Sequence, residues 1–295
     1  MLKFCSLLLT LIFCVLTAEP ASAFPPRRMS KPGEGQRMTI AGLDVIVWQP
    51  VKKPVSVSTE TSPAPLVIFS HGFRGVNNQS IFLMKALADS GYLVIAPNHE
   101  DALANGIAKK RIRFGRPDSW TEETYKDREQ DIKRLTGALH NDSTWSSKID
   151  WTKFALAGHS LGGYTVLGLA GAWPSWKLPS VKAVLALAPY TNPFLRKGTL
   201  KEISVPVMYQ CGNRDTWINL FVKGKNGAFS KTPSPAEYVE LDNANHYAWT
   251  NFNRDDHRKD LICHYAIEFL NKYVCADLSA HPEKQLEGVS TLQAK

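Results

Sequence analysis

The chain has 295 residues, of which 44% are hydrophobic and 21% charged, a composition typical of a packed globular protein and not of a disordered one. Its formal net charge is +8, but the basic residues are scattered and no nucleic-acid-binding module is recognisable, so we expect no nucleic-acid partner. The densest basic run, residues 109–113, is typical of a solvent-exposed loop, although a role towards anionic surfaces or substrates stays open.

The first 23 residues have the pattern of a secretory signal peptide. Lys3 provides a short positive start, residues 4–18 carry no charge, and small residues at 21–23 offer a cleavage site after Ala23. The uncharged stretch is too short to span a bilayer comfortably, so we expect cleavage and no stable membrane span. A retained membrane anchor is the alternative. This pattern predicts a secreted or periplasmic protein.

Beyond residue 36, apolar runs alternate with helical patterns. Two short strand-like runs around Gly42, within residues 38–48, predict an antiparallel hairpin at a sheet edge, and residues 50–65 are typical of a surface loop. Apolar runs without polar alternation are typical of strands that are buried on both faces. Such runs occur at residues 66–69, 92–96, 154–157, 181–188, 205–209 and 238–241, and helical patterns occur at 80–89, 126–139, 161–172 and 256–273.

The alternation of strands and helices predicts one α/β domain over residues 24–275. We expect a mostly parallel central sheet of about eight strands with helices on both faces. The polar residues 276–295 are expected to form a mobile C-terminal tail. Residues 98–123 are long for a connection, and they are a candidate lid over a site.

Three cysteines remain after signal cleavage, namely Cys211, Cys263 and Cys275. An oxidising compartment permits one disulfide among them, and the pairing is left open. Cys263 and Cys275 would lie about 18 Å apart on a continuous helix, so they could pair only if that helix ends early. Cys211 closes an apolar strand and is typical of a small core residue.

The segment GHSLGG at residues 158–163 directly follows the apolar run 154–157 and precedes a helical pattern. This strand–turn–helix context is that of the nucleophile elbow, in which a sharp turn lifts a serine above the end of a parallel sheet. Ser160 is therefore the candidate nucleophile for acyl transfer through a serine ester. The alternative is a glycine-rich turn without chemistry.

A serine nucleophile needs a base and an acid that orients the base. In this architecture the acid and then the histidine follow the serine along the chain, each just after a later strand. Asp215 and His246 lie at these places, and His246 is the only histidine between Ser160 and the last helix. Asp215 could instead cap a helix that begins at Thr216, and His246 could be an ordinary loop histidine. Asp242 is the competing acid.

The oxyanion of a tetrahedral intermediate needs two backbone N–H donors. One is expected from Leu161, directly after the nucleophile, and the other from Phe73 in the segment SHGFRG at residues 70–75. The alternative is that this segment is a simple turn. His71 is expected to brace this loop without transferring protons. His159 is expected to point away from the nucleophile and to have a structural role.

Aromatic residues gather in the loops that should surround the nucleophile. Trp217, Tyr247 and Trp249, with Phe73, are the candidate walls of a substrate pocket, although each could equally be a core residue. Apolar walls suit the acyl or alkyl part of an ester. No group of residues has the spacing of a zinc site, so we expect neither a metal nor another cofactor.

Taken together, these segments resemble the α/β-hydrolase superfamily. Within it the chain is similar to the branch of platelet-activating-factor acetylhydrolases, dienelactone-hydrolase-like enzymes and bacterial cutinases. The resemblance spans about residues 64–272 and rests on SHGFRG at 70–75, GYLVIAPNHED at 91–101, IDWTKFALAGHSLGG at 149–163, GNRD at 212–215 and ANHYAWTNF at 244–252. It implies Ser160 as nucleophile, Asp215 as acid, His246 as base, and Phe73 and Leu161 as oxyanion donors.

Dienelactone hydrolases have a cysteine nucleophile, so Ser160 makes a carboxylic ester the expected substrate. We therefore expect a serine-dependent ester hydrolase that acts through an acyl-enzyme on a small or polymeric ester. Two other classes stay open. One is an acyltransferase on the same scaffold, and the other is a binding protein that has kept the fold without catalysis.

Overall fold

The computed structural model describes residues 34–51, 62–106 and 114–295. The predicted signal peptide and the basic run at 109–113 lie outside these ranges. Within them, no helix combines the length and the apolar character needed to cross a membrane.

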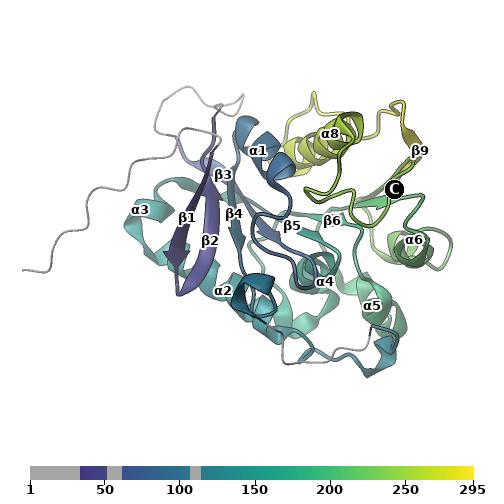
Figure 1. The fold of residues 1–295 in the computed structure, drawn as a ribbon, viewed down its shortest axis with the longest axis horizontal. Helices are drawn as coiled ribbons and strands as arrows, with labels where there is room; N and C mark the ends of the chain where they lie inside the picture. Colours follow the sequence, from purple (N-terminus) through teal and green to yellow (C-terminus); the bar gives the residue numbers. More distant parts are fainter. Residues whose placement is uncertain (1–33, 52–61, 107–113) are drawn as a thin grey trace, which may run out of the picture.

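A nine-stranded sheet forms the centre of the domain, in the order β1-β2-β4-β3-β5-β6-β7-β8-β9 (Figure 1). Its strands are β1 (Gly35–Ile40), β2 (Leu43–Trp48), β3 (Ala64–Ser70), β4 (Leu93–Pro97), β5 (Ile149–His159), β6 (Ala183–Leu187), β7 (Val207–Gly212), β8 (Ala236–Leu241) and β9 (Val289–Ala294). Strands β3 to β8 are parallel, whereas β1, β2 and β9 pair antiparallel with their neighbours. The predicted mostly parallel sheet is confirmed.

Helices cover both faces of the sheet. They are α1 (Ile81–Asp89), α2 (Lys126–Asn141), α3 (Ser143–Ser146), α4 (Leu161–Leu167), α5 (Asn192–Lys197), α6 (Thr216–Val222), α7 (Ala228–Lys231) and α8 (Asp256–Tyr273). Helices α1 and α8 pack against each other on one face, and α2 and α4 lie on the other (Figure 1). Short 3-10 turns occupy 103–105, 117–119, 174–176 and 200–202, and a π turn at 168–172 follows α4.

The central strands show why uninterrupted apolar runs indicated this sheet. Every residue of β3, β4 and β6 is buried, because helices cover the sheet on both sides. The edge strand β1 instead alternates between exposed and less exposed positions. Its hairpin to β2 turns at Ala41 and Gly42, whose φ angles of 52° and 76° suit a two-residue hairpin turn. The edge hairpin is thus confirmed.

Residues 276–295 do not form the expected mobile tail. Strand β9 pairs antiparallel with β8, and the main chains of Ala236 and Lys295 exchange hydrogen bonds of 3.1 and 3.0 Å. The chain leading to β9 is attached to α8, because the Tyr265 hydroxyl donates to the Lys284 carbonyl oxygen at 2.8 Å. Strand β8 would otherwise present an unpaired edge, and pairing with β9 satisfies its backbone groups.

All three cysteines are free thiols, so no pair among them forms a disulfide. Cys211 is fully buried in β7, and its burial raises the pKa of its thiol well above the ordinary value. Cys263 lies within α8, whereas Cys275 lies just beyond its end, where the Tyr92 hydroxyl is 3.4 Å from its sulfur.

Candidate active site

Ser160 lies in a sharp turn between β5 and α4. Its φ of 56° is in the left-handed region, a conformation that costs a non-glycine residue about 1–3 kcal/mol and persists only where the surroundings enforce it. The neighbouring glycines are required by crowding: a Cβ on Gly158 would overlap the Gly162 carbonyl, and one on Gly162 would overlap the Ser70 carbonyl. The Ser160 N–H donates to the Leu187 carbonyl at 2.9 Å, which ties the turn to β6.

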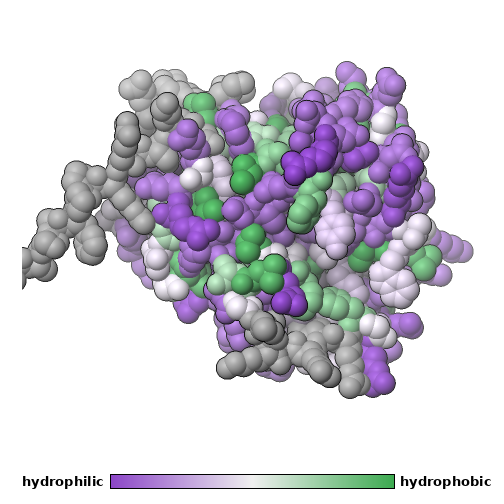
Figure 2. Space-filling model, in the orientation of Figure 1, coloured by the Kyte–Doolittle hydropathy of each residue, from purple (hydrophilic) through white to green (hydrophobic). Residues whose placement is uncertain are grey.

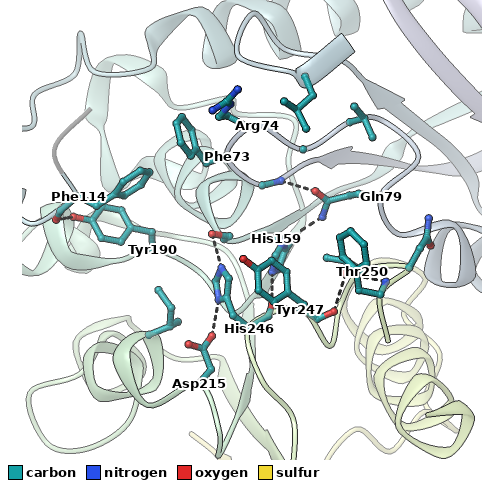
Figure 3. A pocket seen from close by; sticks show the side chains of 18 of the residues that line it. Phe73, Arg74, Gln79, Phe114, His159, Tyr190, Asp215, His246, Tyr247 and Thr250 are labelled. Atoms are coloured by element: carbon teal, nitrogen blue, oxygen red, sulfur yellow. Dashed lines mark hydrogen bonds and ion pairs between the residues drawn. The ribbon is translucent and has the colours of Figure 1, made fainter. Parts of the chain in front are cut away.

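Ser160, His246 and Asp215 form one hydrogen-bonded line (Figure 3). His246 Nε2 is 2.9 Å from Ser160 Oγ, and His246 Nδ1 is 2.6 Å from Asp215 Oδ2. The three residues follow β5, β8 and β7, so the carboxyl ends of these parallel strands bring them together. Because Asp215 can only accept, Nδ1 donates to it, and Nε2 is left free to accept the serine proton.

The geometry separates the two candidate acids. Asp215 is the N-cap residue of α6, but its side chain makes no capping hydrogen bond and instead contacts His246. Asp242 accepts a hydrogen bond from Asn213 Nδ2 at 2.9 Å and has no contact with His246 in the described structure. Of the two carboxylates, only Asp215 is placed to orient the histidine.

The expected oxyanion donors lie on two segments beside Ser160. Phe73 belongs to residues 71–75, here called the oxyanion loop, which follow β3 and border the same pocket as Ser160. Leu161 is the first residue of α4, where main-chain N–H groups have no partner within the helix and the helix dipole is positive. Both positions are compatible with stabilising a negative oxygen next to Ser160.

The oxyanion loop is supported from inside the protein by Arg128, a fully buried residue of α2 that sequence reasoning missed. Arg128 donates to the carbonyl oxygens of His71 at 2.7 Å and Gly72 at 3.1 Å. It also forms two hydrogen bonds of 2.9 Å with Asp101, which accepts from the Arg74 N–H. Burial alone would raise the pKa of Asp101, but the Arg128 charge lowers it to about 2.

A second serine–histidine–aspartate alignment lies beneath this loop. Ser70 Oγ is 2.9 Å from His99 Nε2, and His99 Nδ1 is 3.0 Å from Asp131 Oδ2. Ser70 and His99 are fully buried, and none of the three borders the pocket. Burial also lowers the pKa of His99 well below its ordinary value. Without access to a substrate, this alignment is a structural one.

Two further histidines lie close to the site. His71 Nδ1 donates to the Gly72 carbonyl at 2.7 Å, and its Nε2 accepts from the His99 N–H at 3.0 Å, which is the expected bracing. His159 was expected to point away, but it lies in the pocket wall with its ring centroid 4.9 Å from that of His246. The reason is tertiary packing, since the ring of Trp249 stacks with the His159 ring at a centroid distance of 6.4 Å.

A pocket of about 580 Å³ opens beside Ser160. Apolar side chains form much of its wall, and the space-filling view shows hydrophobic patches in the middle of this face among polar surroundings (Figure 2). The residues that line it are Gly72, Phe73, Arg74, Gly75, Val76, Asn78, Gln79, Leu103, Phe114, His159, Ser160, Tyr190, Asp215, Trp217, Ile218, His246, Tyr247, Thr250, Asn251 and Phe252.

Of the aromatic residues expected in this wall, some line the pocket and one lies in the core. Trp217 and Tyr247 line the pocket with 60% and 58% of their surface exposed. Trp249 does not: it is completely buried, and its indole N–H donates to Gln210 Oε1 at 3.1 Å. The expectation for Trp249 is therefore wrong, because its loop turns this side chain inward under His159.

Two aromatic residues in the wall were not predicted. Tyr190 follows β6, and its hydroxyl donates to the Phe114 carbonyl oxygen at 2.6 Å (Figure 3). The two rings meet edge to face with centroids 5.1 Å apart. Phe114 and Leu103 come from the described parts of the segment 98–123, so this segment contributes to the pocket wall. Tyr190 could have been predicted as a pocket residue from the sequence, because it lies just after a central strand.

A model of the family described as PET hydrolase-like matches residues 54–281, which is most of the chain. The chain belongs to the PET hydrolase-like family. This family has the α/β-hydrolase fold, and the fold class expected from the sequence is confirmed. The serine turn, the oxyanion loop and the loops of Asp215 and His246 all lie inside the matched range.

Curated relatives of this PET hydrolase-like chain are bacterial cutinases, which confirms the resemblance to that branch. It is 26% identical over 213 residues to cutinase est2 of Thermobifida alba, covering 72% of this chain and 60% of that protein. It is 27% identical over 213 residues to cutinase 1 of Thermobifida cellulosilytica, covering 72% and 69%. The match therefore spans about three fifths of the length of the first of these relatives.

Proposed function

We propose that this protein is a serine-dependent carboxylic ester hydrolase. The observation on which the proposal rests is the hydrogen-bonded line from Ser160 through His246 to Asp215, which lies in the wall of a largely apolar pocket. Membership of the PET hydrolase-like family and relatives named cutinases support the same reaction class.

In the proposed reaction, His246 Nε2 accepts the proton of Ser160 Oγ as that oxygen attacks the ester carbonyl. Asp215 keeps the imidazole in the required tautomer and stabilises the imidazolium that forms. The backbone N–H groups of Phe73 and Leu161 stabilise the tetrahedral oxyanion. His246 then donates its proton to the departing alcohol, which leaves an acyl group on Ser160. Water activated by His246 hydrolyses this acyl-enzyme and restores the serine.

The pocket favours an ester with apolar groups. Aromatic rings of Phe73, Tyr190 and Trp217 border it together with Ser160 and His246. This wall can bury an acyl or aryl group and leave the ester carbonyl at the nucleophile. Polymeric esters are included in the proposal, because the family is described by PET hydrolysis and the relatives are named as cutinases. The proposed reaction uses only protein groups and water, so the proposal includes no metal or other cofactor.

The proposal also includes export and domain organisation. The signal-peptide pattern over residues 1–23 supports a secreted or periplasmic enzyme, with the hydrolase domain beginning after Ala23. N-terminal sequencing or intact mass of the exported protein tests the cleavage site. A mature chain that retains residues 1–23 would contradict it.

The reaction class is tested with p-nitrophenyl esters from acetate to palmitate and the mature protein. We expect hydrolysis, with a chain-length optimum that reflects the size of the pocket. Addition of acceptor alcohols separates hydrolysis from acyl transfer, since a transferase forms new esters in preference to free acid. Correctly folded protein that turns over no ester would contradict the proposal and favour the binding-protein alternative.

The role of Asp215 can be separated from that of Asp242. We expect Asp215→Asn to lower kcat by roughly 10³–10⁴-fold, because an asparagine can stabilise the wrong imidazole tautomer. Asp242→Asn, which conserves size in the same way, should change kcat less than about threefold, since its carboxylate contacts Asn213 and not His246. Steady-state kinetics on a soluble ester measure both variants. The opposite ranking would reassign the acid.

A further inference from the structure

We propose that Gln79 is a positioning residue that keeps the oxyanion loop and the loop of His246 in register. Neither the family match nor the reaction outlined above assigns Gln79 a role. The inference rests on the proposed function, because it concerns how two parts of that site are aligned.

The carboxamide of Gln79 is the middle of a chain of hydrogen bonds between the two loops (Figure 3). Its Oε1 accepts from the Gly72 N–H at 2.9 Å, and its Nε2 lies 3.2 Å from His159 Nδ1. His159 Nε2 in turn lies 2.9 Å from the carbonyl oxygen of His246. Three hydrogen bonds thus connect the residue before Phe73 to the main chain of the proposed base.

Only one assignment of donors and acceptors fits this chain of hydrogen bonds. Burial, assisted by the nearby His246, lowers the pKa of His159 to about 3, so its ring is neutral and has one N–H. The His246 carbonyl can only accept, so the proton is on Nε2 and Nδ1 is the acceptor. Gln79 must therefore present its NH₂ group to His159 and its oxygen to Gly72.

The surrounding backbone leaves room for this carboxamide. A Cβ on Gly75 would overlap Gln79 Oε1, and a Cβ on Gly72 would lie only 3.1 Å from His159 Nδ1. The two glycines of the segment SHGFRG therefore make space for the bridge. The Gln79 main chain contributes as well, because its carbonyl oxygen accepts from the Asn251 N–H at 2.7 Å.

The expected consequence is a larger effect on turnover than on substrate affinity, although Gln79 also borders the pocket. Gln79 contacts neither Ser160 nor the ring nitrogens of His246, so it does not take part in bond formation. Gln79 instead accepts a hydrogen bond from Gly72, the residue before Phe73. The Phe73 N–H must be placed relative to Ser160 with an accuracy of a fraction of an ångström. Small displacements of such groups lower kcat, because the oxyanion develops only on the way to the transition state.

The test compares Gln79→Met, His159→Phe and the double variant on a soluble p-nitrophenyl ester. Each single change should lower kcat about 10-fold, with KM within twofold and the melting temperature within about 3 °C of wild type. The double variant should lose no more than either single one, because both break the same bridge. Gln130→Met, the same change at an exposed site on α2, is the matched control. Unchanged kcat in Gln79→Met, or losses that multiply in the double variant, would overturn the proposal.

A second readout does not depend on ester hydrolysis. In ¹⁵N spectra of histidine-labelled protein, His159 should remain the neutral Nε2–H tautomer down to pH 5. Gln79→Glu should raise the pKa of His159, because it places a carboxylate beside Nδ1. A wild-type His159 that titrates near pH 6.5 or averages its tautomers would overturn the bridge. A wild-type protein that hydrolyses no ester would contradict the proposed function while these spectra still test the bridge.

Discussion

Replacing Ser160 with alanine is expected to lower kcat on a p-nitrophenyl ester by about 10⁵–10⁶-fold, on the scale of removing a serine nucleophile elsewhere. The loss is large because no other oxygen lies at hydrogen-bond distance from His246 Nε2 in the described site. The fold and the melting temperature should be unchanged, since alanine at this turn removes only the hydroxyl. Steady-state kinetics of highly purified variants measure the change.

Ser70→Ala is the matched control, because Ser70 belongs to the second serine–histidine–aspartate alignment. Its removal leaves His99 Nε2 without its buried partner, so we expect a loss of about 1–3 kcal/mol in the free energy of unfolding. Turnover should stay within about tenfold of wild type, since Ser70 does not border the pocket. If Ser70→Ala abolished turnover and Ser160→Ala retained more than a tenth of it, the assignment of the nucleophile would be wrong.

The second large effect is expected on stability. Arg128→Met should lower the free energy of unfolding by about 3–5 kcal/mol, because it leaves Asp101 as an unpaired buried charge. It also removes the donor to the carbonyl oxygens of His71 and Gly72. Urea-induced unfolding at pH 7 measures the change. The double variant Arg128→Met/Asp101→Leu should recover part of the loss, because no isolated charge remains.

Arg134→Met is the control for this prediction. Arg134 lies on the same helix, but its side chain is 54% exposed, so water can solvate the charge that it pairs with on Asp131 and we expect a loss below about 1 kcal/mol. The pKa of Asp101 is lowered from 3.8 to about 2, so its pair stabilises fully above pH 4 and the contribution is lost as pH falls towards 2. A loss below 1 kcal/mol in Arg128→Met would contradict this account.

Much of the fold could be predicted because its local signals are strong. The central strands are uninterrupted apolar runs that only a sheet covered on both faces can bury, and helix α8 occupies the predicted residues 256–273. Strand β9 lacks such a signal, because it is a short edge strand with only one buried residue, Val289. Its position depends on the edge of β8 that it covers.

In the candidate site, too, some residues could be predicted from the sequence and others could not. Ser160, Asp215 and His246 could be located because each lies in the turn or loop after a parallel strand, and the ends of such strands meet at one edge of the sheet. Arg128 could not, since its partners are 27 to 57 residues away and its helix shows no pattern that distinguishes it. The burial of the Trp249 side chain could not be predicted from the sequence either, because it depends on packing against His159.

Covalent trapping of the nucleophile is the most direct test of the central claim. The mature protein is treated with a fluorophosphonate ester, digested, and mapped by mass spectrometry. We expect one adduct per chain on the peptide that contains Ser160, and none in Ser160→Ala. An adduct on Ser70 or another serine, or folded protein that forms no adduct, would contradict the account.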